Sequence, residues 1–174
     1  MANCMYCGAQ IPEGSTFCPQ CGKKQVKIYT QTFQRGKMTE EEFFNQINQW
    51  FAMYPHVANV KGEFLIHDKT GLFVNKYVVD AFAIQYELFS STNENQYGVV
   101  KLSTVGLAKT TTDALLYKWQ QNNPGAQVIS RSGGVNQRGQ VGSLALGGIG
   151  AVNNTQLYVF FKFKRATGTA LPQG

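Results

Sequence analysis

The sequence of 174 residues lacks several features that define common functional classes. No apolar run approaches 18 residues, so no membrane-spanning helix is predicted. Histidine occurs only at His56 and His67, and no cysteine follows Cys21, so a cysteine–histidine catalytic pair has no evident source. The N-terminus lacks the charged-then-apolar layout of a secretory signal, and we therefore expect a cytoplasmic protein.

Acidic residues are almost missing from the C-terminal half. Residues 1–94 carry 8 Lys/Arg and 9 Asp/Glu, whereas residues 95–174 carry 8 Lys/Arg and a single acid, Asp113. The net charges of the two parts are therefore −1 and +7. Such asymmetry suggests a nucleic-acid or acidic partner. The spread of these charges over 80 positions favours the simpler reading of a solvated basic surface.

All four cysteines fall in two Cys-x-x-Cys pairs, Cys4/Cys7 and Cys18/Cys21, separated by ten residues. Two tight turns that face each other can aim four thiolates at one tetrahedral Zn²⁺. A glycine follows each pair and permits the positive φ that lets backbone N–H groups point at the sulfurs. Four thiolates fill the coordination sphere, so we predict one structural Zn²⁺ and no catalytic metal. The alternatives, two disulfides or a redox pair, need an oxidising compartment or a βαβ pattern.

This segment resembles the small zinc-ribbon domains that begin many bacterial proteins. The shared pattern is Cys-x-x-Cys-Gly, about ten residues, and Phe-Cys-x-x-Cys-Gly, matched here by Cys4, Cys7, Gly8, Phe17, Cys18, Cys21 and Gly22. The resemblance covers about residues 1–24 and implies a rigid metal-bound knuckle that contacts a protein or a nucleic acid. Within it we expect a short β-hairpin that turns at Pro12–Ser15, with Ile11 and Phe17 covering one side of the metal.

The remaining chain predicts an α+β fold, in which an antiparallel sheet carries two packed helices. The predicted domains are a zinc ribbon at 1–25, a basic linker or short strand at 26–38, and an α+β domain at 39–165. A capping box at Thr39–Glu42 followed by apolar residues at helical spacing predicts a helix with an aromatic core face: Phe43, Ile47, Trp50, Phe51 and Tyr54. A second helix is predicted from Thr110, with Leu115, Leu116 and Trp119 buried. Period-two alternation in several later stretches predicts an antiparallel meander.

Glycine is concentrated between Ser132 and Thr155, where seven of the eighteen glycines lie. We predict a mobile glycine-rich loop at 132–155, with a partner-contact flap as its functional alternative. The segment has no phosphate-binding Gly-x-x-x-x-Gly-Lys pattern. Residues 166–174 are predicted to form a flexible tail.

The sequence offers no evident catalytic constellation, and we expect the protein not to be an enzyme. Asp80 is the only carboxylate predicted on an apolar strand face, and a salt bridge explains it as readily as a general base does. The leading hypothesis is a non-enzymatic interaction module, a structural zinc ribbon on an α+β domain that contacts a protein partner. No small-molecule substrate is evident.

Two alternative functions stay open. The first is nucleic-acid binding, through lysines beside the ribbon and charged or stacking residues on the last strand: Lys23, Lys24, Lys27, Tyr158, Phe160, Lys162, Lys164 and Arg165. The second is a redox sensor whose zinc-bound thiolates oxidise and release the metal. One contiguous basic patch with exposed aromatic rings would favour the first, and scattered lysines would favour a protein partner.

Overall fold

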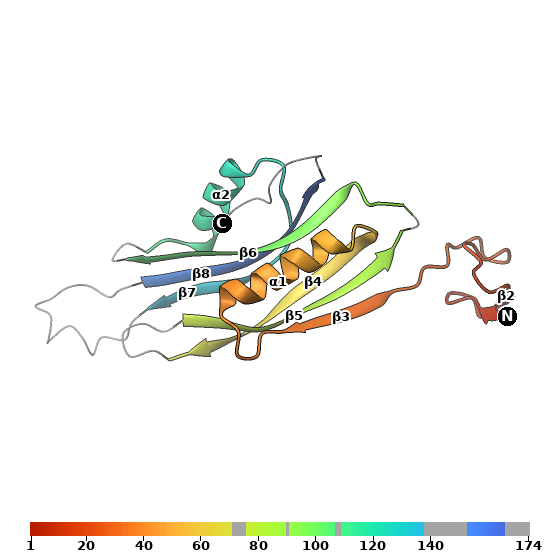
Figure 1. The fold of residues 1–174 in the computed structure, drawn as a ribbon, viewed down its shortest axis with the longest axis horizontal. Helices are drawn as coiled ribbons and strands as arrows, with labels where there is room; N and C mark the ends of the chain where they lie inside the picture. The colour runs from red at the N-terminus through yellow and green to blue at the C-terminus, as the bar shows by residue number, and fades with distance from the viewer. Residues whose placement is uncertain (71–75, 90, 107–108, 138–152, 166–174) are drawn as a thin grey trace, which may run out of the picture.

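The computed structural model describes residues 1–70, 76–89, 91–106, 109–137 and 153–165. A small cysteine-containing unit at the N-terminus stands beyond the end of a larger domain of strands and helices (Figure 1). Residues 26–28, which belong to no strand or helix, connect the two.

The small unit contains two short strand pairs, one across each Cys-x-x-Cys turn. Strand β1 (Ala2–Asn3) pairs antiparallel with β2 (Gln10–Ile11), and a single bridge joins Phe17 to Lys24. The prediction that a single β-hairpin turns at Pro12–Ser15 is therefore wrong. That segment forms a turn, with the Ser15 N–H donating to the Pro12 carbonyl at 3.2 Å, but it connects two strand pairs instead of closing one.

In its described residues, the larger domain contains two three-stranded antiparallel sheets and two helices, which confirms the predicted α+β class. The first sheet has the order β3 (Tyr29–Gln34), β5 (Lys76–Leu88), β4 (Val57–Lys69). The second sheet has the order β6 (Asn95–Gly106), β8 (Asn153–Lys164), β7 (Gln127–Gln137). The helices are α1 (Glu40–Met53) and α2 (Thr112–Asn122).

The two sheets are built from one βαββ unit that occurs twice along the chain. The first repeat is β3-α1-β4-β5 and the second is β6-α2-β7-β8, and in each the last strand takes the central position. Both helices begin after a threonine N-cap, at Thr39 and Thr111. Both carry a tryptophan five residues before a proline, a pattern formed by Trp50 with Pro55 and by Trp119 with Pro124.

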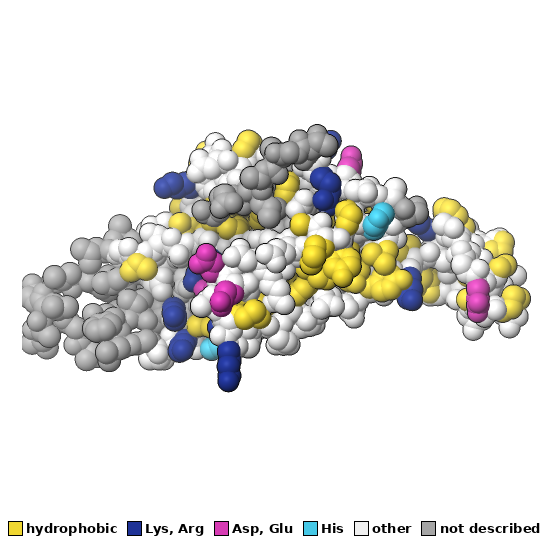
Figure 2. Space-filling view, in the orientation of Figure 1, with side chains coloured by type: hydrophobic (Ala, Val, Ile, Leu, Met, Phe, Trp, Pro, Cys, Tyr) yellow, Lys and Arg dark blue, Asp and Glu magenta, His cyan; other side chains and the backbone are white. Residues whose placement is uncertain are grey.

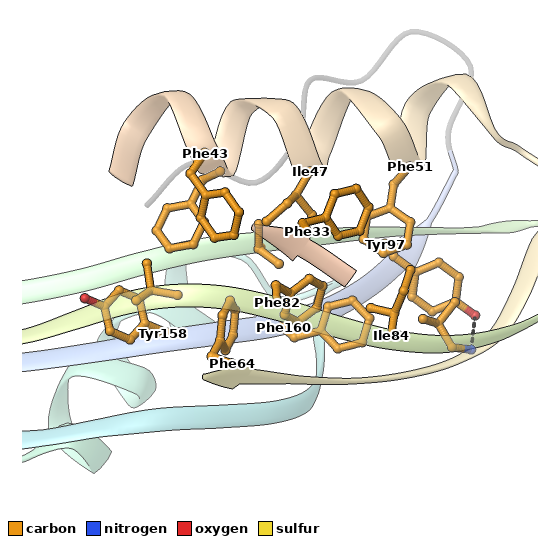
Figure 3. Close-up of a cluster of buried hydrophobic side chains, with 14 of the residues drawn as sticks. Phe33, Phe43, Ile47, Phe51, Phe64, Phe82, Ile84, Tyr97, Tyr158 and Phe160 are labelled. Carbon is orange, nitrogen blue, oxygen red and sulfur yellow. Dashed lines mark hydrogen bonds between the residues drawn. The ribbon is translucent and has the colours of Figure 1, made fainter. Parts of the chain in front are cut away.

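The repeats meet where β4 lies beside β7, and the arrows of these two strands point the same way in Figure 1. Ser130 of β7 donates a hydrogen bond to the Gly62 carbonyl of β4 at 2.5 Å. The two sheets share a core beneath α1, where the rings of Phe82 and Phe160 lie 5.1 Å apart between centroids (Figure 3). One aromatic core therefore serves both repeats.

Helix α1 begins at the predicted capping box. The Thr39 hydroxyl accepts the Glu42 N–H at 3.2 Å, and the Glu42 carboxylate accepts the Thr39 N–H at 2.8 Å. Three members of its aromatic face, Phe43, Ile47 and Phe51, are at most 1% exposed, as expected for core. The outer part of that face differs from the prediction: Trp50 is half-buried and Tyr54 is 51% exposed.

Helix α2 covers the opposite face of the second sheet. Its Leu116 and Trp119 are buried, and the Trp119 ring lies edge-on to Phe161 of β8 at 5.0 Å. Since α1 already covers the other face, β8 is buried continuously from Asn153 to Phe161. The first sheet carries α1 on one face only. Its other face exposes residues such as Thr30, Thr32 and Gln85.

Several domain and loop boundaries predicted from the sequence differ from those in the structure. The segment 26–38, predicted as a basic linker or short strand, contains β3 at Tyr29–Gln34, and its pairing with β5 joins it to the α+β domain that was expected from residue 39. The ends of the expected glycine-rich loop belong to β7 and β8, because Ser132–Gln137 and residues 153–155 are ladder residues. The rest of that loop, 138–152, and the predicted tail, 166–174, lie outside the described residues. No helix in the described ranges is long and apolar enough to cross a membrane.

Candidate metal centre

The four cysteines converge at one point in the N-terminal unit. All four sulfurs lie within 4.8 Å of one another. The Sγ atoms of Cys4 and Cys21 are 3.7 Å apart, and so are those of Cys7 and Cys18. Four sulfurs at about 2.3 Å from a tetrahedral Zn²⁺ would be about 3.8 Å from one another. The four thiols are thus positioned to bind a metal ion.

The two Cys-x-x-Cys turns share one hydrogen-bond pattern. In each, the glycine N–H donates to the carbonyl of the first cysteine at 2.9 Å, Gly8 to Cys4 and Gly22 to Cys18. The N–H of the first cysteine donates in turn to a carbonyl five residues later, at 2.7 Å for Cys4 and 3.0 Å for Cys18. The φ angles of Gly8 and Gly22 are +73° and +68°, a conformation that glycine adopts without strain. The glycines therefore have the role predicted from the sequence.

Two N–H groups donate hydrogen bonds to the Cys4 sulfur. The Tyr6 N–H donates to it at 3.4 Å and the Gln25 side-chain amide donates to it at 3.3 Å. The same Gln25 side chain accepts the Met5 N–H at 3.1 Å, which fixes the orientation of its amide. Such donors offset the negative charge of a thiolate ligand. Sequence reasoning missed Gln25, because no spacing rule distinguishes it from neighbouring polar residues.

The environment lowers the pKa of one cysteine thiol, Cys4, and raises the pKa of another, Cys7. Burial raises the pKa of Cys4, but hydrogen bonds from the Cys7 and Tyr6 amides and the neighbouring thiols outweigh it and lower the pKa to about 6. The Ala9 amide lowers the pKa of Cys7, but the neighbouring thiols and burial outweigh it and raise the pKa to about 12. Thiols this close resist carrying four negative charges together, so a bound cation is needed to stabilise four thiolates.

The metal-binding cluster is shielded on one side only. Cys4 and Cys18 are buried against Ile11, which is 3% exposed, whereas Cys7 is exposed. Ile11 thus covers the cluster as expected. Phe17 does not, because it is 59% exposed, and its predicted covering role is wrong.

Comparison with known families assigns this unit. Residues 3–25 match the family model of the zinc-ribbon domain, and all four cysteines lie inside the match. These residues are a zinc ribbon. The family model does not extend into the α+β domain. No curated protein and no solved structure matches the chain significantly.

The basic residues predicted for nucleic-acid binding lie in two groups, one around the ribbon and one at the end of β8. Lys23, Lys24 and Lys27 are exposed around the ribbon, where each ammonium lies over an aromatic ring at 4.9–6.0 Å. On the last strand, Lys164 is exposed and Lys162 and Arg165 are half-buried.

The two aromatic residues predicted to stack on nucleic-acid bases are not accessible at the surface. Tyr158 and Phe160 are both 0% exposed, because they point into the core that α1 covers. Alternation along β8 predicted one buried and one exposed face. The alternation did not reveal that a helix covers each face of this central strand.

Asp80 pairs with His67 on the surface of the first sheet. His67 Nδ1 lies 2.6 Å from the Asp80 carboxylate, and both side chains are 49% exposed. An exposed ion pair of this kind is the salt bridge foreseen as one explanation of Asp80. Among the described residues, no cysteine or serine hydroxyl contacts the pair.

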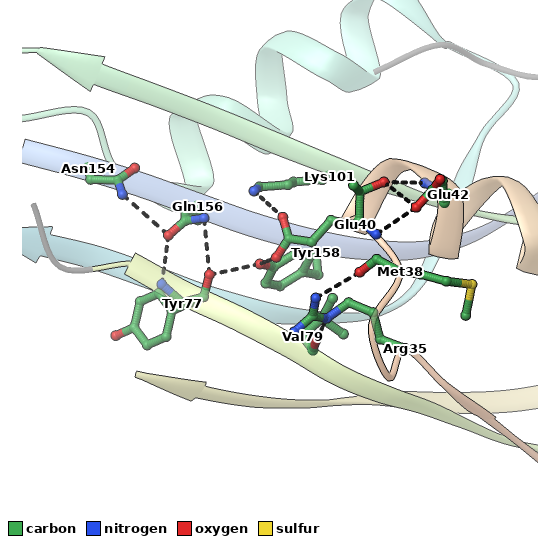
Figure 4. Close-up of polar contacts among 11 residues, drawn as sticks. Arg35, Met38, Glu40, Glu42, Tyr77, Val79, Lys101, Asn154, Gln156 and Tyr158 are labelled. Carbon is green, nitrogen blue, oxygen red and sulfur yellow. Dashed lines mark hydrogen bonds and ion pairs between the residues drawn. The ribbon is translucent and has the colours of Figure 1, made fainter. Parts of the chain in front are cut away.

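A half-buried polar cluster connects the two repeats (Figure 4). Glu40 of α1 forms an ion pair with Lys101 of β6 and accepts a hydrogen bond from the Tyr158 hydroxyl at 2.7 Å. Burial raises the pKa of Glu40, but hydrogen bonds from Lys101 and Tyr158 outweigh it and lower the pKa below its ordinary value. Burial, followed by the Glu40 carboxylate, raises the pKa of Tyr158 well above its ordinary value. The cluster holds its groups in fixed charge states, which suits a structural role.

Proposed function

We propose that the protein is a non-enzymatic interaction module in which the ribbon holds one structural Zn²⁺ and the α+β domain contacts a protein partner. Cys4, Cys7, Cys18 and Cys21 would hold the ion, and Zn²⁺ would supply the free energy that folds a unit too small for a core of its own. Burial of Cys4 and Cys18 with Ile11 supports a structural ion.

The observation that carries the proposal is an apolar surface at the ribbon end of the domain. We call it the ribbon-end patch; its members are Ile28, Met53, Tyr54, Leu88 and Phe89. Figure 2 shows apolar side chains gathered where the end of α1 meets the first sheet beside the ribbon. Met53 is 68% exposed and Tyr54 51%, although both belong to the end of a helix whose other face is core. Contiguous exposed apolar surface of this kind marks protein–protein contacts.

Site-specific photo-crosslinking tests the proposal. A benzophenone amino acid replaces Tyr54 in the ribbon-end patch or, as the matched control, Tyr117 on α2, which is 66% exposed. In the native cells we expect a discrete protein adduct from position 54 and none from position 117. No adduct at 54, or the same adducts at both positions, would contradict a partner contact at the ribbon-end patch.

Nucleic-acid binding is the second candidate, and one observation favours it. Lys24 of the ribbon lies over the Phe89 ring at 6.0 Å, and Phe89 and Lys162 line the same surface cavity. An exposed ring between two lysines is a plausible stacking platform for a single strand. Binding of a single-stranded oligonucleotide that weakens steeply with salt would support this candidate, and its absence would remove it.

A further inference from the structure

Strand β3 is an open edge of the first sheet. It pairs with β5 on one side, and the ladder continues beyond it with the Arg35 N–H donating to the Asp80 carbonyl at 2.8 Å. Antiparallel pairs alternate between hydrogen-bonded and non-hydrogen-bonded positions. The backbones of Tyr29, Gln31 and Phe33 therefore face β5. Those of Thr30, Thr32 and Gln34 point away from the sheet, and these three residues are exposed.

At two other strand positions among the described residues, a side-chain amide closes a free backbone edge. On β6, Asn48 of α1 accepts the Val99 N–H at 2.8 Å and donates to the Val99 carbonyl at 3.1 Å. On β5, where β3 no longer pairs, Gln156 accepts the Tyr77 N–H at 2.7 Å and donates to the Tyr77 carbonyl at 3.2 Å (Figure 4). Each amide takes the place of a neighbouring strand's peptide group.

No such cap protects β3. In the described part of the chain, no protein group hydrogen-bonds the outward N–H and C=O groups of Thr30, Thr32 and Gln34. The strand Tyr-Thr-Gln-Thr-Phe-Gln also lacks the usual protective features, since it contains no charge and no proline. Its register with β5 runs without a bulge, whereas the β4–β5 and β7–β8 registers are both interrupted.

We propose that β3 binds an extended peptide segment of a partner protein as an added strand, which deepens the interaction function proposed above and rests on it. Main-chain hydrogen bonds to Thr30, Thr32 and Gln34 would supply affinity. Aromatic rings beside this edge would contact alternate side chains on the α1 face. Tyr29 stacks on Tyr86 at 5.6 Å, and Trp50 lies 5.5 Å from Tyr86.

Charge specifies the chemistry of this peptide. The segment from Lys23 to Met38, which contains β3, carries five Lys/Arg and no Asp/Glu. Antiparallel pairing of β3 with a second copy of itself would bring the Lys27 end of one chain against the Arg35 end of the other, and like charges across a ladder are destabilising. The occupant that fits is an extended segment with an alternating apolar and polar centre and acidic residues at both ends.

A defined peptide tests this proposal on the zinc-loaded full chain. The probe is a fluorescein-labelled ten-residue peptide, Glu-Glu-Val-Thr-Val-Thr-Val-Thr-Glu-Glu, and binding is read by fluorescence anisotropy. Replacing its four glutamates with lysine should weaken binding at least about tenfold. The protein variant Thr32→Pro, which removes one outward N–H and places a ring on the edge, should also weaken binding about tenfold or more. The control Thr32→Val keeps that N–H and should change binding less than about threefold.

A ligand-side control covers the case in which Thr32→Pro fails to fold. Two probes carry N-methyl groups on alternate residues of the centre, one probe for each register. Methylation of the residues that face β3 should abolish binding to the wild-type chain, and methylation of the others should not. Equal binding by the glutamate and lysine probes, or by both methylated probes, would overturn the proposal.

The oligomeric state is measured in parallel by analytical ultracentrifugation. A dimer that Thr32→Pro dissociates would overturn the proposal in favour of self-pairing. Failure of the peptide test with a persistent Tyr54 adduct would remove the β3 site and leave the proposed interaction function standing. Failure of the adduct with successful peptide binding would locate the contact at the strand edge and not at the ribbon-end patch.

Discussion

The two repeats of the α+β domain share a topology but differ in how much of their surface is covered. The central strand of the second repeat, β8, is buried on both faces from Asn153 to Phe161. The central strand of the first repeat, β5, contains both core residues such as Phe82 and exposed residues such as Gln85. The same βαββ unit therefore has a central strand that is buried on both faces in one copy, and it keeps an accessible sheet face and an open edge in the other.

The difference arises from the two helices. Helix α1 has 14 residues and an aromatic face that reaches both sheets, where Phe51 lies 5.9 Å from Phe160 of the second repeat. Helix α2 has 11 residues, and its buried Leu116 and Trp119 pack in a core cluster with residues of its own sheet. Because α1 packs on both sheets and α2 packs on the second, the first sheet keeps an uncovered face among the described residues.

The largest expected change in the free energy of unfolding comes from a residue of β8 that packs against α2. Replacing Phe161 by Ala should lower the free energy of unfolding by about 3–5 kcal/mol, since a fully buried ring that packs on Trp119 leaves a cavity. Replacing Gln85 on the uncovered face of β5 should change it by no more than about 0.5 kcal/mol. Urea unfolding measures both. Similar losses for the two variants would show that the repeats are not covered differently.

A smaller contrast is expected at two glycines in the strands where the repeats meet. Gly133 of β7 has φ +145°, and a Cβ there would overlap the Gln156 carbonyl oxygen of β8. Gly133→Ala should therefore cost about 3 kcal/mol. A Cβ at Gly62 of β4 would meet only the side chains of Phe82 and Ile84, at 2.8 and 3.0 Å, and Gly62→Ala should cost about 1 kcal/mol. The reverse order in thermal or urea unfolding would contradict the described β7–β8 contact.

A substitution at Glu40 tests the polar contact between the two repeats, which Glu40 makes with Lys101 and Tyr158. Glu40→Gln should lower the free energy of unfolding at pH 7 by about 1–3 kcal/mol, because Lys101 loses its charged partner. Glu41→Gln, on the exposed side of the same turn, is the matched control and should have little effect.

The pH dependence of that difference follows from the lowered pKa of Glu40. A carboxyl group with a lowered folded-state pKa contributes stability above its unfolded pKa, and this contribution is lost as the pH falls through the folded value. The difference between wild type and Glu40→Gln should therefore shrink between about pH 5 and pH 3. A difference that grows as the pH falls would be inconsistent with this ion pair.

The smallest effect on the repeats is expected from removing zinc. A strong chelator, or Cys18→Ser, should unfold residues 1–25, because metal binding supplies the folding free energy of so small a unit. The melting temperature of the α+β domain should shift by less than about 2 °C, since the ribbon, whose Lys24 ammonium lies 6.0 Å from the Phe89 ring, contributes no residue to the described core of that domain. Metal analysis should give one zinc per chain before treatment. Loss of cooperative unfolding in both repeats would contradict their independence from the ribbon.

Local signals in the sequence predicted the parts of the molecule that short-range chemistry determines. The spacing of Cys4, Cys7, Cys18 and Cys21 gave the metal-binding cluster, and Thr39 with Glu42 gave the start of α1. Both rest on contacts between residues close in the chain.

The repeat and the two-sided burial of β8 were not predictable in the same way, since they depend on how distant elements pack. Tyr158 and Phe160 lie on the same strand face as Lys162 and Lys164, as expected for an exposed face, and only the position of α1 buries both rings. Asn48 and Gln25 look like ordinary polar residues, and their roles appear only when Val99 and Cys4 come within hydrogen-bond distance.

Native-state hydrogen exchange at Thr32 and Val99 tests the central claim, that the first repeat has an open edge and the second a closed one. Both N–H groups point away from their sheets, but only Val99 donates to a protein group, the Asn48 side chain at 2.8 Å. We predict that the Val99 amide exchanges at least about 100-fold more slowly than the Thr32 amide. Equal protection of the two amides would show that β3 is already covered and would contradict the account.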